Sequence, residues 1–314
     1  MAVAVNVDNF VRAETARMFD GGMLKTGGIN RFHHERLPVP IDAQTVIRMN
    51  RDTLYSSALV NITEGATLTI PDPAGRYVSL MGVNEDHYVN DVFHEGGSYE
   101  LTMDMFESPF VALVMRTFLN PDEPEDVAAV HAFQDGVQVE ARSHQPYGHP
   151  EYDEKTRKAT FDALVSLAGG TPDASRMFGT SQDVDPVHHL IGTAAAWGGL
   201  PKEEAYYIVD TEPRPAGHYT FILRNVPVDG FWSVTIYNRD GFLEANPYDS
   251  YSLNNVTAVP DSDGTVTLNL APADEGLNNH LYVMEGWNYT LRLYRPRQSI
   301  LDGTWTIPRP EPVK

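Results

Sequence analysis

Hydrophobic and polar residues alternate with a period of two in both halves of the chain, and this spacing is typical of β-strands. In the segment 232–237, Trp232, Val234 and Ile236 fall on one side, while Ser233, Thr235 and Tyr237 fall on the other. The same alternation predicts further strands at 66–70, 77–83, 110–118, 219–223, 266–270 and 289–294.

Helical spacing occurs at the N-terminus and in the middle of the chain. The pair Asp185-Pro186 predicts an N-cap followed by proline at the first helical position. The pair Gly21-Gly22 predicts the end of the first helix. Residues 27–36 are expected to form an irregular loop, and 203–207 one more helical turn. The helical segments are expected at 8–19, 121–133, 151–168 and 186–197.

Together these patterns predict a mainly β protein with two β-sandwich, jelly-roll-like domains joined by a helical connector. Turn-forming sequences such as Pro71-Asp-Pro-Ala-Gly75 separate the short strands. The expected divisions are 1–139 for an N-terminal β-rich domain with a leading helix, 140–205 for the connector, and 206–314 for a C-terminal β-sandwich.

The length and the net charge of the chain indicate which classes of binding partner to expect. With 314 residues, of which 42% are hydrophobic, the chain is long enough for two cores. A formal net charge of −20 repels phosphate backbones, so no nucleic-acid partner is expected. No stretch approaches the roughly 20 apolar residues of a membrane span. The first residues do not resemble a signal peptide, so the chain as given is expected to be cytoplasmic, or periplasmic or secreted if a leader was removed. The sequence leaves open whether the protein forms a homo-oligomer.

Several kinds of chemistry are excluded by missing residues or motifs. The chain has no cysteine, which excludes thiolate nucleophiles and disulfides. Nucleophile-elbow, P-loop and dinucleotide-binding patterns are also missing, so no cofactor is expected. No spacing of histidines and carboxylates matches a metal motif, so no metal is expected. If a metal were bound, His87, Asp91 and His94 would be the first ligands to test.

Several short motifs, in order, resemble the paired families of domains of unknown function numbered 1254 and 1214. The first motifs are Asn30-Arg-Phe-His-His-Glu-Arg36, Arg48-Met-Asn-Arg-Asp-Thr-Leu-Tyr-Ser56, Pro71-Asp-Pro-Ala-Gly-Arg-Tyr77, Asn84-Glu-Asp-His-Tyr88 and Asp185-Pro-Val-His-His-Leu190. In the C-terminal half they are Gly230-Phe-Trp-Ser-Val-Thr-Ile-Tyr237, Asn246-Pro247 and Gly286-Trp-Asn-Tyr-Thr-Leu-Arg-Leu-Tyr-Arg-Pro296. The resemblance implies two β-sandwich domains in one chain, often in bacteria and sometimes exported, but no activity. The residues His280-Leu281 stand where a leucine–proline pair is usual.

Polar residues of the N-terminal motifs are the candidates for catalysis. His33, Asp52, Tyr55 and His87 are expected at loops or strand ends, where residues distant in sequence can meet. In this interpretation Asp52 acts as base or orients His33, and Tyr55 donates a hydrogen bond. The alternative for each residue is a polar network that only connects strand ends.

Seven further residues are candidates for substrate binding: Arg36, Asn50, Arg51, Glu85, Trp232, Asn246 and Arg292. Arginines can hold an anionic group, and the aromatic residues of the C-terminal half can form a binding platform or simply a core. Three functions remain open. The first is a small-molecule enzyme using acid–base or hydrolytic chemistry in a polar pocket between the two sandwiches or at the pole of one. The others are a carbohydrate or small-ligand binding protein and an assembly module.

Overall fold

The computed structural model describes residues 2–44, 47–171 and 173–314, which form two compact units. The N-terminal unit contains Met1–Arg36, Leu54–Leu119 and Glu123–Lys202. The C-terminal unit contains Leu37–Thr53, Asn120–Asp122 and Glu203–Lys314. The chain therefore passes between units several times, and the segment around Asp52 folds with the C-terminal unit. Within the described residues no helix is long and apolar enough to cross a membrane.

The N-terminal unit contains a five-stranded sheet in the order β1-β2-β7-β4-β5. Its described pairings are antiparallel, and His33 of β1 lies opposite Ser57 of β2. The strands are β1 (His33–His34), β2 (Thr53–Asn61), β7 (Phe110–Phe118), β4 (Val78–Asn84) and β5 (Val89–Phe93).

A second, three-stranded sheet packs against one face of the first. It has the order β6-β3-β8, formed by β6 (Gly97–Leu101), β3 (Ala66–Ile70) and β8 (Gln138–Ala141). Alternate residues of both sheets, including Val60, Leu68 and Leu113, form one buried core. The unit is therefore a β-sandwich, and burial of this core is its main stabilising contribution.

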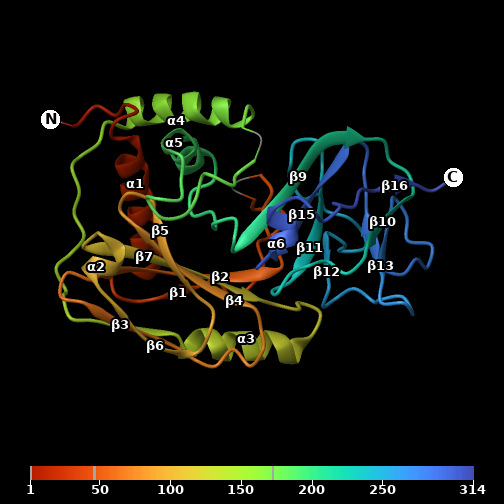
Figure 1. Cartoon of the computed structure of the whole chain (residues 1–314), viewed down its shortest axis with the longest axis horizontal. Helices are drawn as coiled ribbons and strands as arrows, with labels where there is room; N and C mark the ends of the chain where they lie inside the picture. Colours follow the sequence, from red (N-terminus) through yellow and green to blue (C-terminus); the bar gives the residue numbers. More distant parts are fainter. Residues whose placement is uncertain (1, 45–46, 172) are drawn as a thin grey trace. The chain divides into compact units, whose positions relative to one another are not determined.

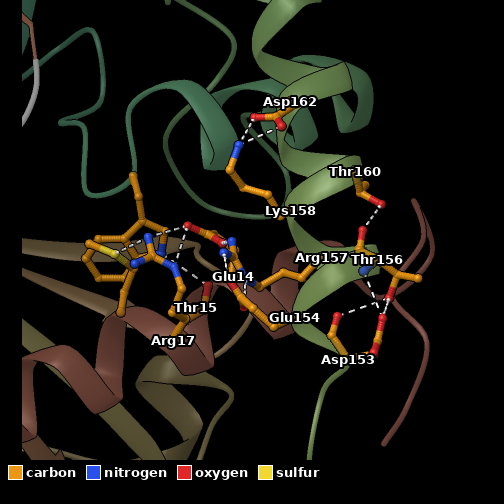
Figure 2. Close-up of polar contacts among 12 residues, drawn as sticks. Glu14, Thr15, Arg17, Asp153, Glu154, Thr156, Arg157, Lys158, Thr160 and Asp162 are labelled. Atoms are coloured by element: carbon orange, nitrogen blue, oxygen red, sulfur yellow. Dashed lines mark hydrogen bonds and ion pairs between the residues drawn. The ribbon is translucent and has the colours of Figure 1, made fainter.

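Helices cover both sides of this sandwich (Figure 1). The helices α1 (Phe10–Thr26), α4 (Glu154–Ala168) and α5 (Pro186–Ala195) lie on one side of the five-stranded sheet and share a small core of their own. The helix α3 (Pro124–Gly136) lies on the other side, and α2 (Met103–Phe106) is a single turn before β7. Figure 2 shows the polar contacts between α1 and α4, where Glu14 accepts from Arg17 at 2.6 Å and pairs with Arg157.

The C-terminal unit is a second β-sandwich. One sheet has the order β12-β11-β15-β9 and the other β14-β13-β10-β16. Val234, Leu268 and Leu291 belong to the core that both sheets share. The strands are β9 (Ala205–Arg214), β10 (Tyr219–Leu223), β11 (Trp232–Tyr237), β12 (Ser252–Asn254), β13 (Val266–Ala271), β14 (His280–Tyr282), β15 (Trp287–Tyr294) and β16 (Glu311–Pro312). The short helix α6 (Gln298–Leu301) follows β15.

The structure confirms a mainly β fold with sandwich domains, and corrects three local predictions. The first helix continues through Gly21-Gly22 and ends at Gly27, which has a φ of 71° and donates to the Met23 carbonyl. The turn expected at 203–207 is instead the start of β9, and the loop at 27–36 contains β1. Helix α5 begins as expected, because the Asp185 carboxylate accepts from the backbone N–H groups of Val187 and His188.

Candidate functional site

Two of the four candidate catalytic residues share one face of the five-stranded sheet. His33 is directly opposite Ser57, so both side chains point to the same side. Tyr55 is two residues before Ser57 on β2 and therefore lies on this side too. Diagonal neighbours such as His33 and Tyr55 are about 7–8 Å apart at the backbone. All three side chains are half-buried, so this face, which we call the His33 face, is open to solvent in part.

The imidazole of His33 has a carboxylate partner on the same face. Its Nε2 lies 3.4 Å from Oε1 of Glu35, two residues further along the chain. That carboxylate also accepts from Nζ of Lys25 on α1 at 2.8 Å, and this hydrogen bond is the main reason why the pKa of Glu35 is lowered. An ionised carboxylate holds the proton of a neutral imidazole on Nε2, which leaves Nδ1 free to accept another.

The ring of Tyr55 contacts a buried arginine on the neighbouring strand β7. The guanidinium of Arg116 on β7 lies 5.4 Å from the centre of the Tyr55 ring, within the range of a cation–π contact. Arg116 also donates to the carbonyl oxygen of Gly198 at 2.9 Å. The Gly198 N–H in turn donates to Nε2 of His87 at 2.9 Å. The backbone of one residue, Gly198, thus connects His87 to Arg116, which contacts Tyr55.

His87 is completely buried, and both of its ring nitrogens are bonded. Because Gly198 donates to Nε2, the proton of the ring resides on Nδ1, which lies 2.8 Å from the hydroxyl of Thr193. The ring stacks on Trp197 and His189. Burial is the main cause that holds its pKa well below the ordinary value, followed by the charge of His189. This environment keeps His87 neutral and fixes one tautomer.

Arg36 and Glu85 have partners away from the His33 face. Arg36 lies three residues after His33 in the chain. It donates to the carbonyl oxygen of His131 at 3.0 Å, to Gln134 at 3.2 Å and to Asp135, and these three residues lie on α3. The carboxylate of Glu85 accepts from Ser108 at 2.7 Å and lies 3.4 Å from Arg12. The structure therefore places His33 and Tyr55 on the same face of the sheet and Arg36 on the opposite side.

The segment 48–53 carries three of the candidate residues and covers one sheet of the C-terminal unit. Asn50 accepts from the Asp52 backbone N–H at 2.9 Å and donates to the Tyr294 hydroxyl at 3.0 Å. Arg51 donates to the carbonyl oxygen of Val39. Oδ1 of Asp52 accepts from Ser252 at 2.8 Å and from Asn254 at 3.3 Å, both on β12. These contacts attach the motif to the sheet surface.

Arg292 lies on the same surface and is buried. Its guanidinium donates to the hydroxyl groups of Thr235 at 2.8 Å and Tyr237 at 2.7 Å, and to the carbonyl oxygen of Arg48 at 2.9 Å. Burial by itself would lower the pKa of Arg292, but the phenol oxygens of Tyr237 and Tyr294 raise it above its ordinary value. Arg292 therefore stays charged and joins the segment 48–53 to β11 and β15.

Two other candidate binding residues have structural surroundings. Trp232 is 5% exposed and belongs to the core between the two sheets of its unit. Asn246 closes a turn, because its amide oxygen accepts from the backbone N–H groups of Tyr248 and Ser250. Trp232 is therefore part of the core of this unit, and Asn246 is part of a turn.

Among the residues that the structure describes, no group of three or more His, Asp or Glu side chains is placed to hold a metal ion. Of the three ligands to test first, His94 directs Nδ1 at the Val78 carbonyl oxygen, 2.7 Å away, and Asp91 accepts from the neighbouring N–H of Val92. His87 is fully bonded as described above.

Two segments of the chain match models of known protein families. Residues 29–100 match the family described as protein of unknown function DUF1254. Residues 209–298 match the family described as protein of unknown function DUF1214. The chain thus carries the pairing of these two families that its motifs indicate, with DUF1254 in the N-terminal half and DUF1214 in the C-terminal half. No curated protein matches the chain.

Two solved structures share the fold over almost the whole chain. The VPA0106 protein from Vibrio parahaemolyticus is 19% identical, with 98% of each chain covered and a TM-score of 0.77. An uncharacterised protein from Burkholderia cenocepacia is 16% identical, with 98% of this chain and 87% of that chain covered and a TM-score of 0.56. At these identities the likeness concerns the fold alone.

Sequence reasoning did not single out Glu35, Ser57 and Arg116 as site residues. The signal for Glu35 and Ser57 is present in the sequence, because residues two apart on a strand share a face. Glu35 is two residues from His33, and Ser57 is two from Tyr55. Arg116 carries no such signal, because its contact with Tyr55 depends on the pairing of distant strands.

Proposed function

We propose that this protein is an enzyme that uses acid–base chemistry on a small organic molecule bound at the His33 face. The observation that carries the proposal is the contact between His33 and Glu35, on the same side of the sheet as Tyr55. An imidazole oriented by a carboxylate, with a second proton-carrying group nearby, is the arrangement that general acid–base catalysis uses.

In this proposal His33 is the base, and Glu35 orients it. The carboxylate of Glu35 keeps the imidazole proton on Nε2, so that Nδ1 takes a proton from the substrate or from an attacking water. The Tyr55 phenol donates a proton or a hydrogen bond to the oxygen on which negative charge develops. Ser57, which is opposite His33 and two residues from Tyr55 on the same face, offers a hydroxyl for binding. Arg116 and His87 are positioning residues, because Arg116 contacts the Tyr55 ring and both residues bond the backbone of Gly198.

The proposal is tested by looking for proton transfer without knowing the natural substrate. Small esters, lactones and ketones are incubated with the protein in D₂O, and proton NMR records hydrolysis or exchange of the hydrogens next to the carbonyl group. We expect at least one compound to be converted by the unmodified protein.

A Tyr55→Phe variant then removes only the phenol hydroxyl. We expect it to lower the rate by about 10²-fold or more, as is usual for loss of an acid–base group. The matched control is His131→Gln, because His131 lies on α3 and bonds the Arg36 carbonyl oxygen on the other side of the sheet. If no compound is converted, or if Tyr55→Phe and the control behave alike, the proposal fails.

A further inference from the structure

Two buried oxygen atoms in the C-terminal unit lack hydrogen-bond partners among the described residues. They are Oδ2 of Asp52 and Oγ of Ser233. Asp52 is 4% exposed, and Ser233 is 0% exposed. Buried polar atoms in folded proteins are nearly always bonded, so a pair without partners calls for an explanation.

Asn254 is the neighbour that Asp52 and Ser233 have in common on one face of the sheet. Ser233 on β11 is directly opposite Asn254 on β12, so their side chains point to the same side. Asn254 donates to Oδ1 of Asp52 at 3.3 Å, and Ser252 donates to the same oxygen at 2.8 Å. Both donors fix the carboxylate through Oδ1 and leave Oδ2 available to another donor.

The charges of Asp52 and Arg292 indicate which charge a ligand at Oδ2 of Asp52 can carry. Oδ2 is a carboxylate oxygen, so it repels an anionic group and accepts from a donor. Arg292 is directly opposite Ser233 on β15, and its positive charge interacts with Asp52. A cationic ligand would therefore meet a guanidinium beside the carboxylate that it approaches. An uncharged hydroxyl group avoids both conflicts.

We propose that this face binds a small neutral molecule with neighbouring hydroxyl groups, of the polyol class. One hydroxyl donates to Oδ2 of Asp52, and its neighbour exchanges a hydrogen bond with Oγ of Ser233. The site uses residues of the C-terminal unit alone and does not depend on the proposed chemistry at the His33 face. Because both oxygens are buried, binding requires a local opening of the face, which favours small ligands.

The test uses erythritol and xylitol as neutral probes and erythronate as the anionic counterpart of erythritol. Ligand-observed NMR on the full chain measures saturable binding. We expect both neutral probes to bind and erythronate to bind at least tenfold more weakly. Absence of saturable binding by the neutral probes, or equal binding of erythronate, would overturn the proposal.

Variants then locate the site. Ser233→Ala removes one of the two oxygens, and Asp52→Asn replaces the accepting oxygen; each should weaken erythritol binding at least tenfold. Thr267→Ala is the matched control, because Thr267 lies on β13 of the other sheet and bonds Asp261. Melting curves establish that the variants fold. If Asp52→Asn does not fold, Ser233→Ala decides alone, and unchanged affinity in it contradicts the site.

Discussion

The carboxylate of Glu14 on α1 and the guanidinium of Arg157 on α4 form an ion pair in which the residues are only 1% and 7% exposed. Arg17 donates to the same carboxylate from the other side at 2.6 Å. Arg157 reaches further to the exposed Glu154, with contacts of 2.6 and 2.7 Å (Figure 2). The pair therefore connects two helices that are far apart in sequence and joins a buried charge to a surface charge.

Removing one partner of this pair should be strongly destabilising. We expect Glu14→Gln to lower the free energy of unfolding by about 3–5 kcal/mol, because it removes the buried carboxylate partner of Arg157. Glu154→Gln is the matched control and should cost less than about 1 kcal/mol, since that carboxylate is exposed. Urea denaturation measures both values. Equal losses for the two variants would show that burial of the pair is not what matters.

Replacing either of two glycines by alanine should change the stability of the protein, but in opposite directions. A Cβ added at Gly82 on β4 would lie 2.2 Å from Cε1 of Phe106, whose side chain is fully buried. We expect Gly82→Ala to cost about 1–3 kcal/mol through overpacking. A Cβ at Gly22 in α1 meets nothing within 4 Å, so Gly22→Ala should stabilise the helix by about 0.5–1 kcal/mol. Thermal unfolding of both variants measures the two effects. A stabilising Gly82→Ala or a destabilising Gly22→Ala would contradict the prediction.

The stability of the protein should fall in mild acid because of His34. Its pKa is lowered to about 4, mainly by burial and then by the charge of Arg36. In the unfolded chain histidine titrates near 6.5, so the unfolded state binds the proton more tightly between these values. The stability associated with neutral His34 is therefore complete above pH 6.5 and is lost as the pH falls toward 4. His34→Gln should flatten the slope of unfolding free energy against pH in that window, and an unchanged slope would speak against it.

His149 should affect the pH dependence of stability in the opposite direction. Burial is the largest single effect on its pKa and opposes the charged form. The hydrogen bonds to Asp20, at 2.9 Å, and to the Pro150 carbonyl oxygen, together with the negative charge of Asp20, outweigh burial and raise the pKa. The folded state then holds the proton more tightly, so this stability is present below pH 6.5 and is lost as the pH rises through the higher folded value. In His149→Gln the unfolding free energy should change less between pH 6 and 8 than in the unmodified protein. A steeper change would contradict this assignment.

Period-two patterns predicted part of the strands of both sandwiches. β3, β10 and β13 bury alternate residues, whereas β4, β7, β11 and β15 are buried on both faces. β3, β7, β10 and β11 have the predicted bounds. β9 was missed because its second half contains polar residues such as Asp210 and Glu212 and its pairing with β15 is not visible in local sequence. The extension of α1 through Gly21-Gly22 was missed because packing of α1 against α4 and α5 outweighs the low helix propensity of glycine.

The candidate site was predictable only where residues belong to paired strands. His33 and Tyr55 share a face because β1 and β2 are neighbours in the sheet. Arg36 has its partners on the other side of the sheet because it is an odd number of residues from His33, a consequence of alternation. The chain leaves the C-terminal unit between Thr53 and Leu54, so Asp52 and Tyr55 belong to different units. That crossing depends on tertiary contacts and has no local sequence signal.

The most direct test of the account is the rate at which His33→Gln converts the compound that the unmodified protein turns over in D₂O. Glutamine keeps much of the shape and polarity of the side chain but cannot act as a base. We predict that the rate falls by about 10²–10⁴-fold, with the melting temperature unchanged within a few degrees. A His33→Gln rate within threefold of the unmodified protein would contradict the assignment of His33 as the base.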